Sequence, residues 1–468
     1  MAQHDYNIAD QPGASFLADL NAALYAIVTQ NSGATAPSPT YPYQLWADTT
    51  SGKLKMRNAS NTAWLDVMTL ANAKAIAAAT ADNAANLTGT STSNIPTSAL
   101  GSGTANSATF LRGDRTWVSI PSTVVSNVVG LVQVQTGGAG SPLNYRRVDE
   151  NFNPIVNTHN LWFNWHPTYA GITTQVIDGQ YMVRIPRFYF KAGTVPSGTY
   201  AGKTYWMISP YPASGFSVHP AFLGAGGVRF DQIWVGKYQA SYDGSSKAQS
   251  IPGVMPMVNA SFPTARARAY ARNMGGVSGF RLWSIYDLSA IQMLATIEMG
   301  GLDMQSLIGQ GRVNESSAAN VDASDVAQAT WRGIVGLWGN VWQMTDGIKR
   351  KDGNWHRWQC NVPGSTTTND FSTGYFDTGQ SALTTSGWPV TFNISLLESG
   401  IIVPDSLDNT YGNGSTGDQF FSDANTDDRA WFHGGRWVNG SDAGLFCGRA
   451  DLTPLGVSNT IGTRLAKV

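Results

Sequence analysis

Apolar residues recur at three- and four-residue steps near the start of the chain. This helical spacing joins Phe16, Leu17, Leu20, Leu24, Ile27 and Val28. It is typical of one face of an α-helix, and it stops at Asn31-Ser32-Gly33. The pattern predicts one amphipathic helix over residues 12–30, which needs a surface against which to bury its apolar face.

Short alternating runs follow within residues 43–70, separated by turn-forming residues, and they predict a small β-meander. Between residues 71 and 110 this pattern is lost. Only Lys74 and Asp82 are charged there, and the composition passes from alanine-rich to rich in glycine, serine and threonine. Such residues cannot build a globular core, and isolated helices of this length are marginal in water. We interpret the segment as a stem ordered by packing against copies of itself; a flexible linker is the alternative.

The rest of the chain alternates between strand and helix patterns. Strands are predicted at 124–135 and 180–191 because apolar residues alternate with polar ones. Two helices are predicted at 262–274, before a glycine pair, and at 285–299. These elements, with helices packed on a mostly antiparallel sheet, make the expected fold class a multidomain, mainly α+β chain.

The second of these helices has a clear start. Ser284 precedes it and Asp287 stands three positions later, which is a capping box that satisfies free backbone N–H groups. The buried stripe of this helix is expected to contain Leu288, Ile291, Leu294 and Ala295.

Length and composition restrict the possible classes. A chain of 468 residues exceeds the ~250–300 residues at which single cores stop growing, so several domains are expected. Only 13% of the residues are charged and the net charge is −1, which provides no electrostatic footprint for nucleic acid or anionic lipid. No apolar run reaches ~18 residues and the start lacks a secretory leader, so we expect neither membrane insertion nor secretion through a signal peptide.

Few residues are candidates for metal or redox chemistry. Cys360 and Cys447 are too few for a disulfide framework, lack metal-ligand spacing and are expected to be unpaired. Asp423, Asn425 and Asp427 have the spacing of calcium-loop ligands, but the glycine and glutamate of that motif are missing. A calcium site of other geometry remains open; no cofactor is predicted. We interpret the Arg-Gly-Asp at 112–114 as a turn rather than an integrin motif.

The last third of the chain contains two cassettes rich in tryptophan and glycine, residues 331–346 and 431–466. Glycine lets backbone pass close to large rings, and tryptophan supplies rigid contact area. Five segments occur in a characteristic order: 230–238, 260–282, Gly339–Trp342 (GNVW), Gly434–Trp437 (GGRW) and Ile461–Arg464 (IGTR). Over about residues 205–466 they resemble the C-type-lectin-like fold of formylglycine-generating-enzyme relatives. That subfamily includes the variable receptor-binding proteins of phages and of diversity-generating retroelements.

The resemblance implies a phage tail fibre, located in the virion, that adsorbs to a bacterial surface receptor such as a glycan, a pilus or an outer-membrane protein. The N-terminal block resembles the attachment domains of tail fibres, which implies docking to the tail or baseplate. Residues 101–117 resemble a short element of such fibres. A homotrimer is expected. The predicted domains are tail attachment (1–70), stem (71–125), a β-rich connecting region (126–204) and the lectin-like receptor-binding domain (205–468).

The cassette at 431–466 separates into scaffold and display positions. Scaffold positions are Gly434, Gly435, Trp437, Gly440, Ala443, Gly444, Phe446, Pro454, Ile461, Gly462 and Arg464. The candidate receptor-binding residues alternate with them and are expected to point outward together: Trp431, His433, Arg436, Asn439, Ser441, Asp442, Cys447, Arg449 and Asp451. Mixed aromatic, arginine and amide side chains are typical of binding hot spots. Ordinary solvent-facing loop residues are the alternative.

Catalysis is not expected. Formylglycine-generating enzymes hold copper with two reactive cysteines near the C-terminus, whereas the matching C-terminal region here has only Cys447. A glycan depolymerase needs two carboxylates on a carbohydrate groove, and the four glutamates, Glu150, Glu298, Glu315 and Glu398, have no paired context. A tail-associated enzyme of either kind, or a purely structural tail component, is the alternative to receptor binding.

Overall fold

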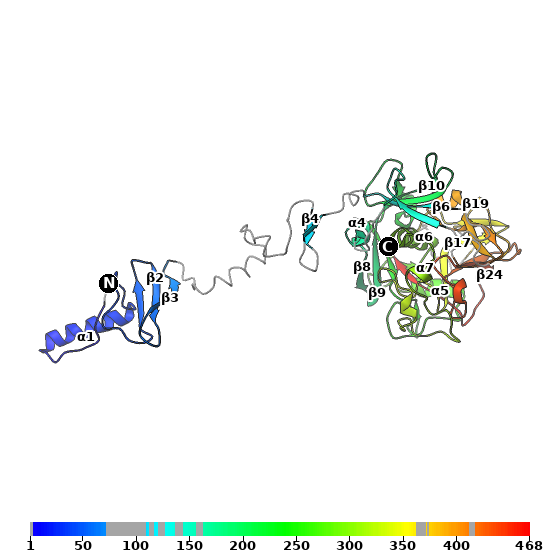
Figure 1. The fold of residues 1–468 in the computed structure, drawn as a ribbon. Coiled ribbons are helices and arrows are strands. Elements are labelled where there is room, and N and C mark those ends of the chain that lie inside the picture. Colours follow the sequence, from blue (N-terminus) through cyan, green and yellow to red (C-terminus); the bar gives the residue numbers. More distant parts are fainter. Residues whose placement is uncertain are drawn as a thin grey trace. The chain divides into compact units, whose positions relative to one another are not determined.

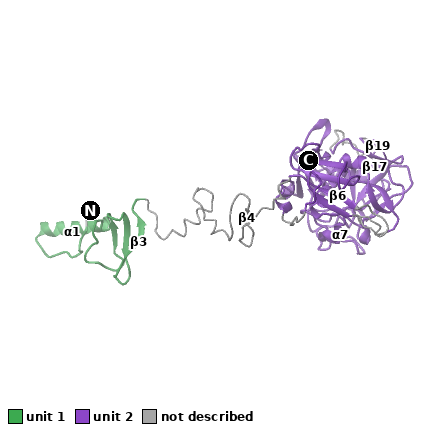
Figure 2. Cartoon of the chain, turned by 45° about the horizontal axis from the view of Figure 1, so that its top comes forward, with its two compact units in different colours: residues 1–121 green, residues 122–468 purple. Residues whose placement is uncertain are grey.

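The chain is divided into two compact units. The computed structural model describes residues 3–71, 109–111, 117–119, 127–135, 144–155, 162–361, 371, 374–410 and 417–468. Unit 1 comprises residues 1–121 and unit 2 residues 122–468 (Figure 2). The predicted stem lies almost wholly outside the described residues, as does the Arg-Gly-Asp sequence. The predicted division at residue 205 falls inside unit 2.

Unit 1 contains the predicted helix and the predicted meander. Helix α1 spans Gly13–Val28 and is followed by an antiparallel sheet in the order β1-β2-β3 (Figure 1). Its strands are Leu45–Asp48, Lys53–Arg57 and Trp64–Thr69. The helix has only two buried residues, Ala23 and Ala26. A separate hairpin joins β4 (Thr109–Leu111) to β5 (Trp117–Ser119).

Unit 2 is built on three sheets. The first has the order β12-β10-β11-β6-β7 and is antiparallel. Its strands are Ser217–Val218, Tyr189–Thr194, Thr204–Ser209, Val129–Gln135 and Asn144–Val148. The second, also antiparallel, has the order β16-β26-β13-β9-β8. Its strands are Phe280–Leu282, Leu465–Lys467, Gln232–Gly236, Gln180–Pro186 and Thr173–Ile177.

The third sheet carries both tryptophan-rich cassettes and has the order β19-β18-β17-β23-β24-β22. Its strands are Phe376–Ser381, Asn354–Arg357, Trp342–Lys351, Arg429–His433, Gly448–Leu452 and Phe420–Phe421. Strand β25 (Ile461–Thr463) runs parallel to the first half of β17. Two hairpins complete the strands: β14 (Ser241–Tyr242) with β15 (Ala248–Gln249), and β20 (Trp388–Phe392) with β21 (Pro404–Asp408).

The strand predicted at 180–191 is two strands. β9 ends at Pro186 in the second sheet, and β10 begins at Tyr189 in the first. Proline has no N–H to donate to a ladder, so it favours a strand end. The amide of Arg187 instead donates to the carbonyl of Asp231 at 2.8 Å. The chain therefore switches sheets at this proline, which alternation alone does not reveal.

Helix α6 (Ile285–Met299) forms the centre of unit 2. Its capping box is confirmed: the Ser284 hydroxyl accepts from the amide of Asp287, and the Asp287 carboxylate accepts from the amide of Ser284 at 2.8 Å. The expected single buried stripe is wrong, because every residue from Ile285 to Ile297 is buried. The helix contacts β6, β11 and β17, and only its last two residues, Glu298 and Met299, are half-buried.

The remaining helices are short. They are α4 (Pro167–Ala170), α5 (Phe262–Tyr270), α7 (Met304–Leu307) and α8 (Ile394–Glu398), with 3₁₀ turns at 162–164, 220–222, 225–227, 326–328 and 440–442. Strand outweighs helix throughout unit 2, an arrangement compatible with a C-type-lectin-like fold. Among the described residues, none of the helices combines the length and apolarity required to cross a bilayer.

Candidate functional site

The two cassettes lie side by side in the third sheet. Strand β17 pairs antiparallel with β23, so that Gln343 lies opposite His433, while β25 pairs with the same stretch of β17 on its other side. The amide of Gly339 donates to the carbonyl of Gly434 at 3.0 Å and links the two glycine-rich segments directly. Trp338 and Trp342 are buried beneath this junction. The cassettes therefore form one rigid platform.

The Gly-Asn-Val-Trp motif makes a tight turn in this platform. Gly339 has φ +74°, and a Cβ there would lie 2.6 Å from the carbonyl oxygen of Arg312, so only glycine fits. Asn340 is also left-handed, with φ +62°, which asparagine tolerates better than most residues. Its buried amide donates to Oε1 of Gln239 at 2.8 Å and accepts from the amide of Ala319 at 2.9 Å. The motif thus holds three separate loops together.

The terminal Ile-Gly-Thr-Arg motif buries a complete guanidinium group. Arg464 donates to Oε1 of Gln343 and to four backbone carbonyls, those of Gly236, Lys237, Val335 and Gly336, at 2.7–3.2 Å. Burial lowers the pKa of Arg464 to about 9. This residue ties the C-terminal strand to the second sheet and to the loop before β17, as expected for a scaffold position.

Three of the nine candidate binding residues point into the protein, so the expectation that all nine face outward is wrong. Trp431, His433 and Cys447 are exposed by 3%, 1% and 0%. Strand β23 lies between β17 and β24, and both of its faces are covered: Trp431 packs in one apolar core and Phe432 in another. Alternation along such a strand distributes side chains between two interiors instead of between core and solvent.

The buried His433 and Cys447 are electrostatically neutral scaffold residues. Nε2 of His433 lies 3.1 Å from the carbonyl of Leu337, and its ring contacts that of Trp283. Burial, followed by the charge of Arg464, lowers the pKa of His433 to about 3. Burial raises the pKa of the Cys447 thiol well above its usual range. Neither Cys360 nor Cys447 forms a disulfide bond, as predicted.

Besides the buried Cys447, four candidate residues lie together on the connection between β23 and β24, residues 434–447, which we name the display loop. Ser441 is exposed, and Arg436, Asn439 and Asp442 are half-buried. Asn439 stabilises the loop itself, since its side-chain oxygen accepts from the amide of Arg436 at 2.8 Å. Oδ1 of Asp442 accepts from the indole N–H of Trp388 at 3.2 Å. For the side chains of Arg436 and Ser441, the structure describes no hydrogen bond.

The display loop is fixed by residues on both sides. A Cβ on Gly444 would collide with the carboxylate of Asp418, which occupies that space and accepts from the amide of Phe446 at 2.6 Å. Burial raises the pKa of Asp418 well above its usual range, although that amide opposes the shift. The loop is therefore supported by a buried carboxyl group that the sequence pattern did not single out.

The last two candidate residues, Arg449 and Asp451, lie on β24. Their side chains point to the same side of the strand and form a two-pronged ion pair, at 2.8 and 2.9 Å. The Arg449 guanidinium lies over the ring of Trp342, 5.2 Å from its centroid. These residues are half-buried and already partnered, so they are less available to a ligand than the display loop.

Sequence reasoning missed two parts of this surface. Val438, in the display loop, has half of its surface exposed. A second loop, around residues 313–315, adjoins it: the amide of Glu315 donates to the carbonyl of Trp437 at 2.6 Å, and the amide of Gly440 donates to the carbonyl of Val313 at 2.9 Å. Both contacts join segments more than 100 residues apart, so no local sequence signal could have found them.

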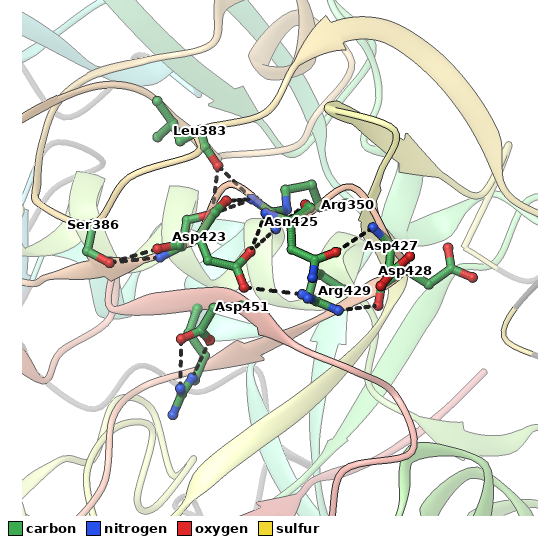
Figure 3. Close-up of polar contacts among 11 residues, drawn as sticks. Arg350, Leu383, Ser386, Asp423, Asn425, Asp427, Asp428, Arg429 and Asp451 are labelled. Carbon is green, nitrogen blue, oxygen red and sulfur yellow. Dashed lines mark hydrogen bonds and ion pairs between the residues drawn. The ribbon is translucent and has the colours of Figure 1, made fainter.

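The acidic loop considered for calcium is held by cations (Figure 3). The buried Arg350 binds the Asp423 carboxylate and donates to the carbonyl of Asn425 at 2.8 Å, and Nε of Arg429 lies 3.4 Å from the other Asp423 oxygen. Asp428 pairs with Lys349 at 2.9 Å. Within the described residues, no group of three metal-ligating side chains is present. The carboxylates of Asp423 and Asp428 thus neutralise buried cations.

Replacing Asp423 by Asn is expected to destabilise unit 2 by about 1.5 kcal/mol, because the buried Arg350 loses its anionic partner. Burial alone would raise the pKa of Asp423, but the hydrogen bond and charge of Arg350 hold it below its usual range. The contribution is therefore present above the unfolded pKa and is lost as pH falls through the folded pKa. Urea unfolding at pH 7 and at pH 3 measures both effects.

The matched control is Asp427→Asn, which removes an exposed carboxylate from the same loop. Its free energy of unfolding should stay within about 0.5 kcal/mol of wild type. Equal losses in the two variants would show that the pairing with Arg350 is not what stabilises the loop.

Neither a protein-family model nor a curated protein matches the chain significantly. Among solved structures, the chain is similar to Treponema denticola variable protein 1, with 11% identity over 63% of this chain and 98% of that chain and a TM-score of 0.29. It is also similar to the Major Tropism Determinant U1 variant, with 12% identity, coverage of 92% and 95%, and a TM-score of 0.26. PvdO from Pseudomonas aeruginosa gives 12% identity, coverage of 64% and 98%, and a TM-score of 0.23. These TM-scores are too low to carry an argument about fold or function.

Proposed function

We propose that this chain is a phage tail fibre protein that attaches the virion to a bacterial surface receptor through the display loop of unit 2. The observation that carries the proposal is the contrast within residues 434–447. Gly434, Gly435, Gly444, Trp437, Leu445 and Phe446 are buried, whereas Arg436, Val438 and Ser441 reach solvent. A rigid backbone with exchangeable side chains suits recognition because little conformational entropy is lost on binding.

Binding in this proposal is non-covalent and requires no turnover. Cys447, the one cysteine near the C-terminus, where formylglycine-generating enzymes hold copper, is a buried thiol with a raised pKa, whereas copper binding requires thiolates. The location is the virion tail, with unit 1 nearest the tail or baseplate and three copies of the chain in each fibre. Three display loops acting at once would multiply weak individual contacts.

Replacing Arg436 and Val438 together by Ala is expected to weaken adhesion of the purified full-length protein to susceptible bacteria at least tenfold. Arginine and well-supported apolar contacts dominate binding surfaces, and neither side chain is part of the buried core. The measurement is binding of fluorescently labelled protein to cells as a function of concentration, with circular dichroism to verify folding.

The matched control combines Arg187→Ala with Val176→Ala. Val176 is 53% exposed, close to the 50% of Val438, and both control residues lie on unit 2 outside the display loop. Adhesion should be unchanged in this control. Equal adhesion of the Arg436/Val438 variant and wild type would place the receptor surface elsewhere, and shortening of host polysaccharide by the protein would favour an enzyme.

A further inference from the structure

Helix α1 of unit 1 presents a stripe of large apolar side chains to solvent. The exposed fractions are 43% for Phe16, 56% for Leu17, 51% for Leu24, 54% for Ile27 and 78% for Val28, and Leu20 lies half-buried among them. At about 100° per residue, these six side chains occupy one third of the helix circumference. The two buried alanines that face unit 1 lie beside the stripe, not within it. The predicted amphipathic face therefore remains uncovered in the single chain.

The stripe carries no charge. The only carboxylate of the helix belongs to Asp19, and it is engaged by Nε2 of His4 at 2.7 Å, by the amide of Ala9 at 3.3 Å and by the side chain of Gln11 at 3.2 Å. The helix contains no lysine or arginine. Surface helices usually carry charged residues on the face opposite their core, and a contiguous apolar patch marks an interaction site.

The spacing within the stripe identifies the kind of partner. Leu17, Leu20, Leu24 and Ile27 follow steps of three, four and three residues, which are the a, d, a and d positions of two heptads. Phe16 and Val28 flank them and widen the seam. Such a seam is complementary to a parallel copy of itself, because each side chain of the seam then packs against the same residue of the neighbouring chain. Leucine at a with isoleucine at d favours bundles of more than two helices, and the second of the two heptads, with Leu24 and Ile27, has this combination.

The exposed area agrees with an association of several copies. A fully exposed aromatic side chain contributes about 200 Å² of surface. With the exposed fractions given above, the six side chains of the stripe together expose about 500 Å² of apolar surface per chain. Two copies would bury about 1,000 Å² in one interface, close to the lower end of the about 1,200–2,000 Å² of stable two-partner interfaces. A third copy adds about 500 Å² to the total apolar surface buried along the same seam.

We propose that α1 is the seam along which three copies of this chain associate, with the stripe 16-17-20-24-27-28 at the centre of a parallel bundle. This proposal rests on the proposed function only for the number of chains, three. It adds to that function a contact surface for the trimer that lies outside the predicted stem. It does not depend on the display loop, so loss of receptor binding and loss of association can be told apart.

The test substitutes Leu17→Glu and Leu24→Glu together in the full-length chain. Light scattering should give three copies for wild type at micromolar concentration and one copy for the variant, since burying two carboxylates per chain in an apolar seam is strongly unfavourable. The matched control, Ala18→Glu with Ala22→Glu, adds the same charges at exposed positions on another face of α1 and should remain trimeric. A monomeric wild type, or a trimeric Leu17/Leu24 variant, would overturn the proposal.

Cross-linking gives a second readout that does not depend on disrupting the helix. Leu20→Cys places a thiol at a d position of the seam, and mild oxidation should link copies covalently, whereas Ala22→Cys should not exceed the wild-type background. The wild-type background measures any covalent linkage that forms through Cys360 and Cys447. Absence of linked chains in the Leu20→Cys variant, with bacterial adhesion retained, would indicate that the stripe contacts something other than this chain.

Discussion

Replacing Arg464 by Met is expected to destabilise unit 2 by about 4 kcal/mol. The guanidinium is completely buried and satisfies four backbone carbonyls and the side chain of Gln343. Methionine fills part of the volume but donates no hydrogen bond, so several buried acceptors lose their partners at once, each at a cost of about 1–3 kcal/mol before relaxation. The free energy of unfolding of a whole domain is about 5–15 kcal/mol, so this one substitution would remove a large fraction of it.

The experiment compares urea unfolding of Arg464→Met with that of Arg187→Met. Arg187 forms a surface ion pair with Asp231, whose carboxylate is 87% exposed, and exposed pairs of this kind contribute about 0–1 kcal/mol. Arg464→Lys is informative as well, because an ammonium group cannot reach five acceptors in a planar fork. A loss for Arg464→Met no larger than that for Arg187→Met would contradict the role assigned to the IGTR motif.

Replacing His219 by Asn is expected to make unit 2 less sensitive to acid. His219 is fully buried, and its Nδ1 accepts from the amide of Ala221 at 3.2 Å, which requires an unprotonated nitrogen. Burial lowers its pKa to about 3, against an unfolded value of about 6.5. Below pH 6.5 the unfolded state binds a proton that the folded state excludes, so this side chain costs stability as pH falls from 6.5 to 3.

The expected size follows from linkage. At pH 5 the wild type should have lost about 2 kcal/mol through His219 alone, relative to pH 7.5. Asparagine does not titrate and is a favourable N-cap, so it can keep the hydrogen bond to Ala221. The observable is the difference in free energy of unfolding between pH 7.5 and pH 5, measured for both proteins.

Other groups affect both proteins alike. His166 and His433 are also buried with lowered pKa values, of about 4 and 3, and act in the same direction as His219. The buried Asp418, whose pKa is raised, acts in the opposite direction because its folded form binds the proton more readily. The comparison of wild type with the Asn variant cancels these contributions. Identical pH slopes for the two proteins would refute a buried, neutral His219.

Much of the local structure followed from the sequence alone. The three- and four-residue spacing near the start predicted α1, and the Ser284–Asp287 capping box fixed the start of α6, because these features depend only on neighbouring residues. The glycine-rich motifs marked the platform correctly, since left-handed turns and close backbone contacts demand glycine or asparagine wherever they occur.

The candidate site was predicted only in part. Alternation along residues 431–451 placed Trp431, His433 and Cys447 on an outward face, but β23 is covered on both sides. Alternation gives the two faces of a strand; whether a face meets solvent depends on the layers that segments distant in sequence place above it. The same reason explains why α6 is buried all round although a single stripe was expected.

The sequence by itself determined where the helices α1, α5 and α6 lie and which motifs require glycine, but not the short helices α4, α7 and α8. The tertiary structure alone decided which side chains of the cassette reach solvent, that Arg464 meets carbonyls from two distant segments and that the calcium-like loop is occupied by Arg350. Local geometry is set by short-range sterics and hydrogen bonds, whereas exposure and pairing depend on contacts between residues as far apart as Gly236 and Arg464, 228 positions from each other.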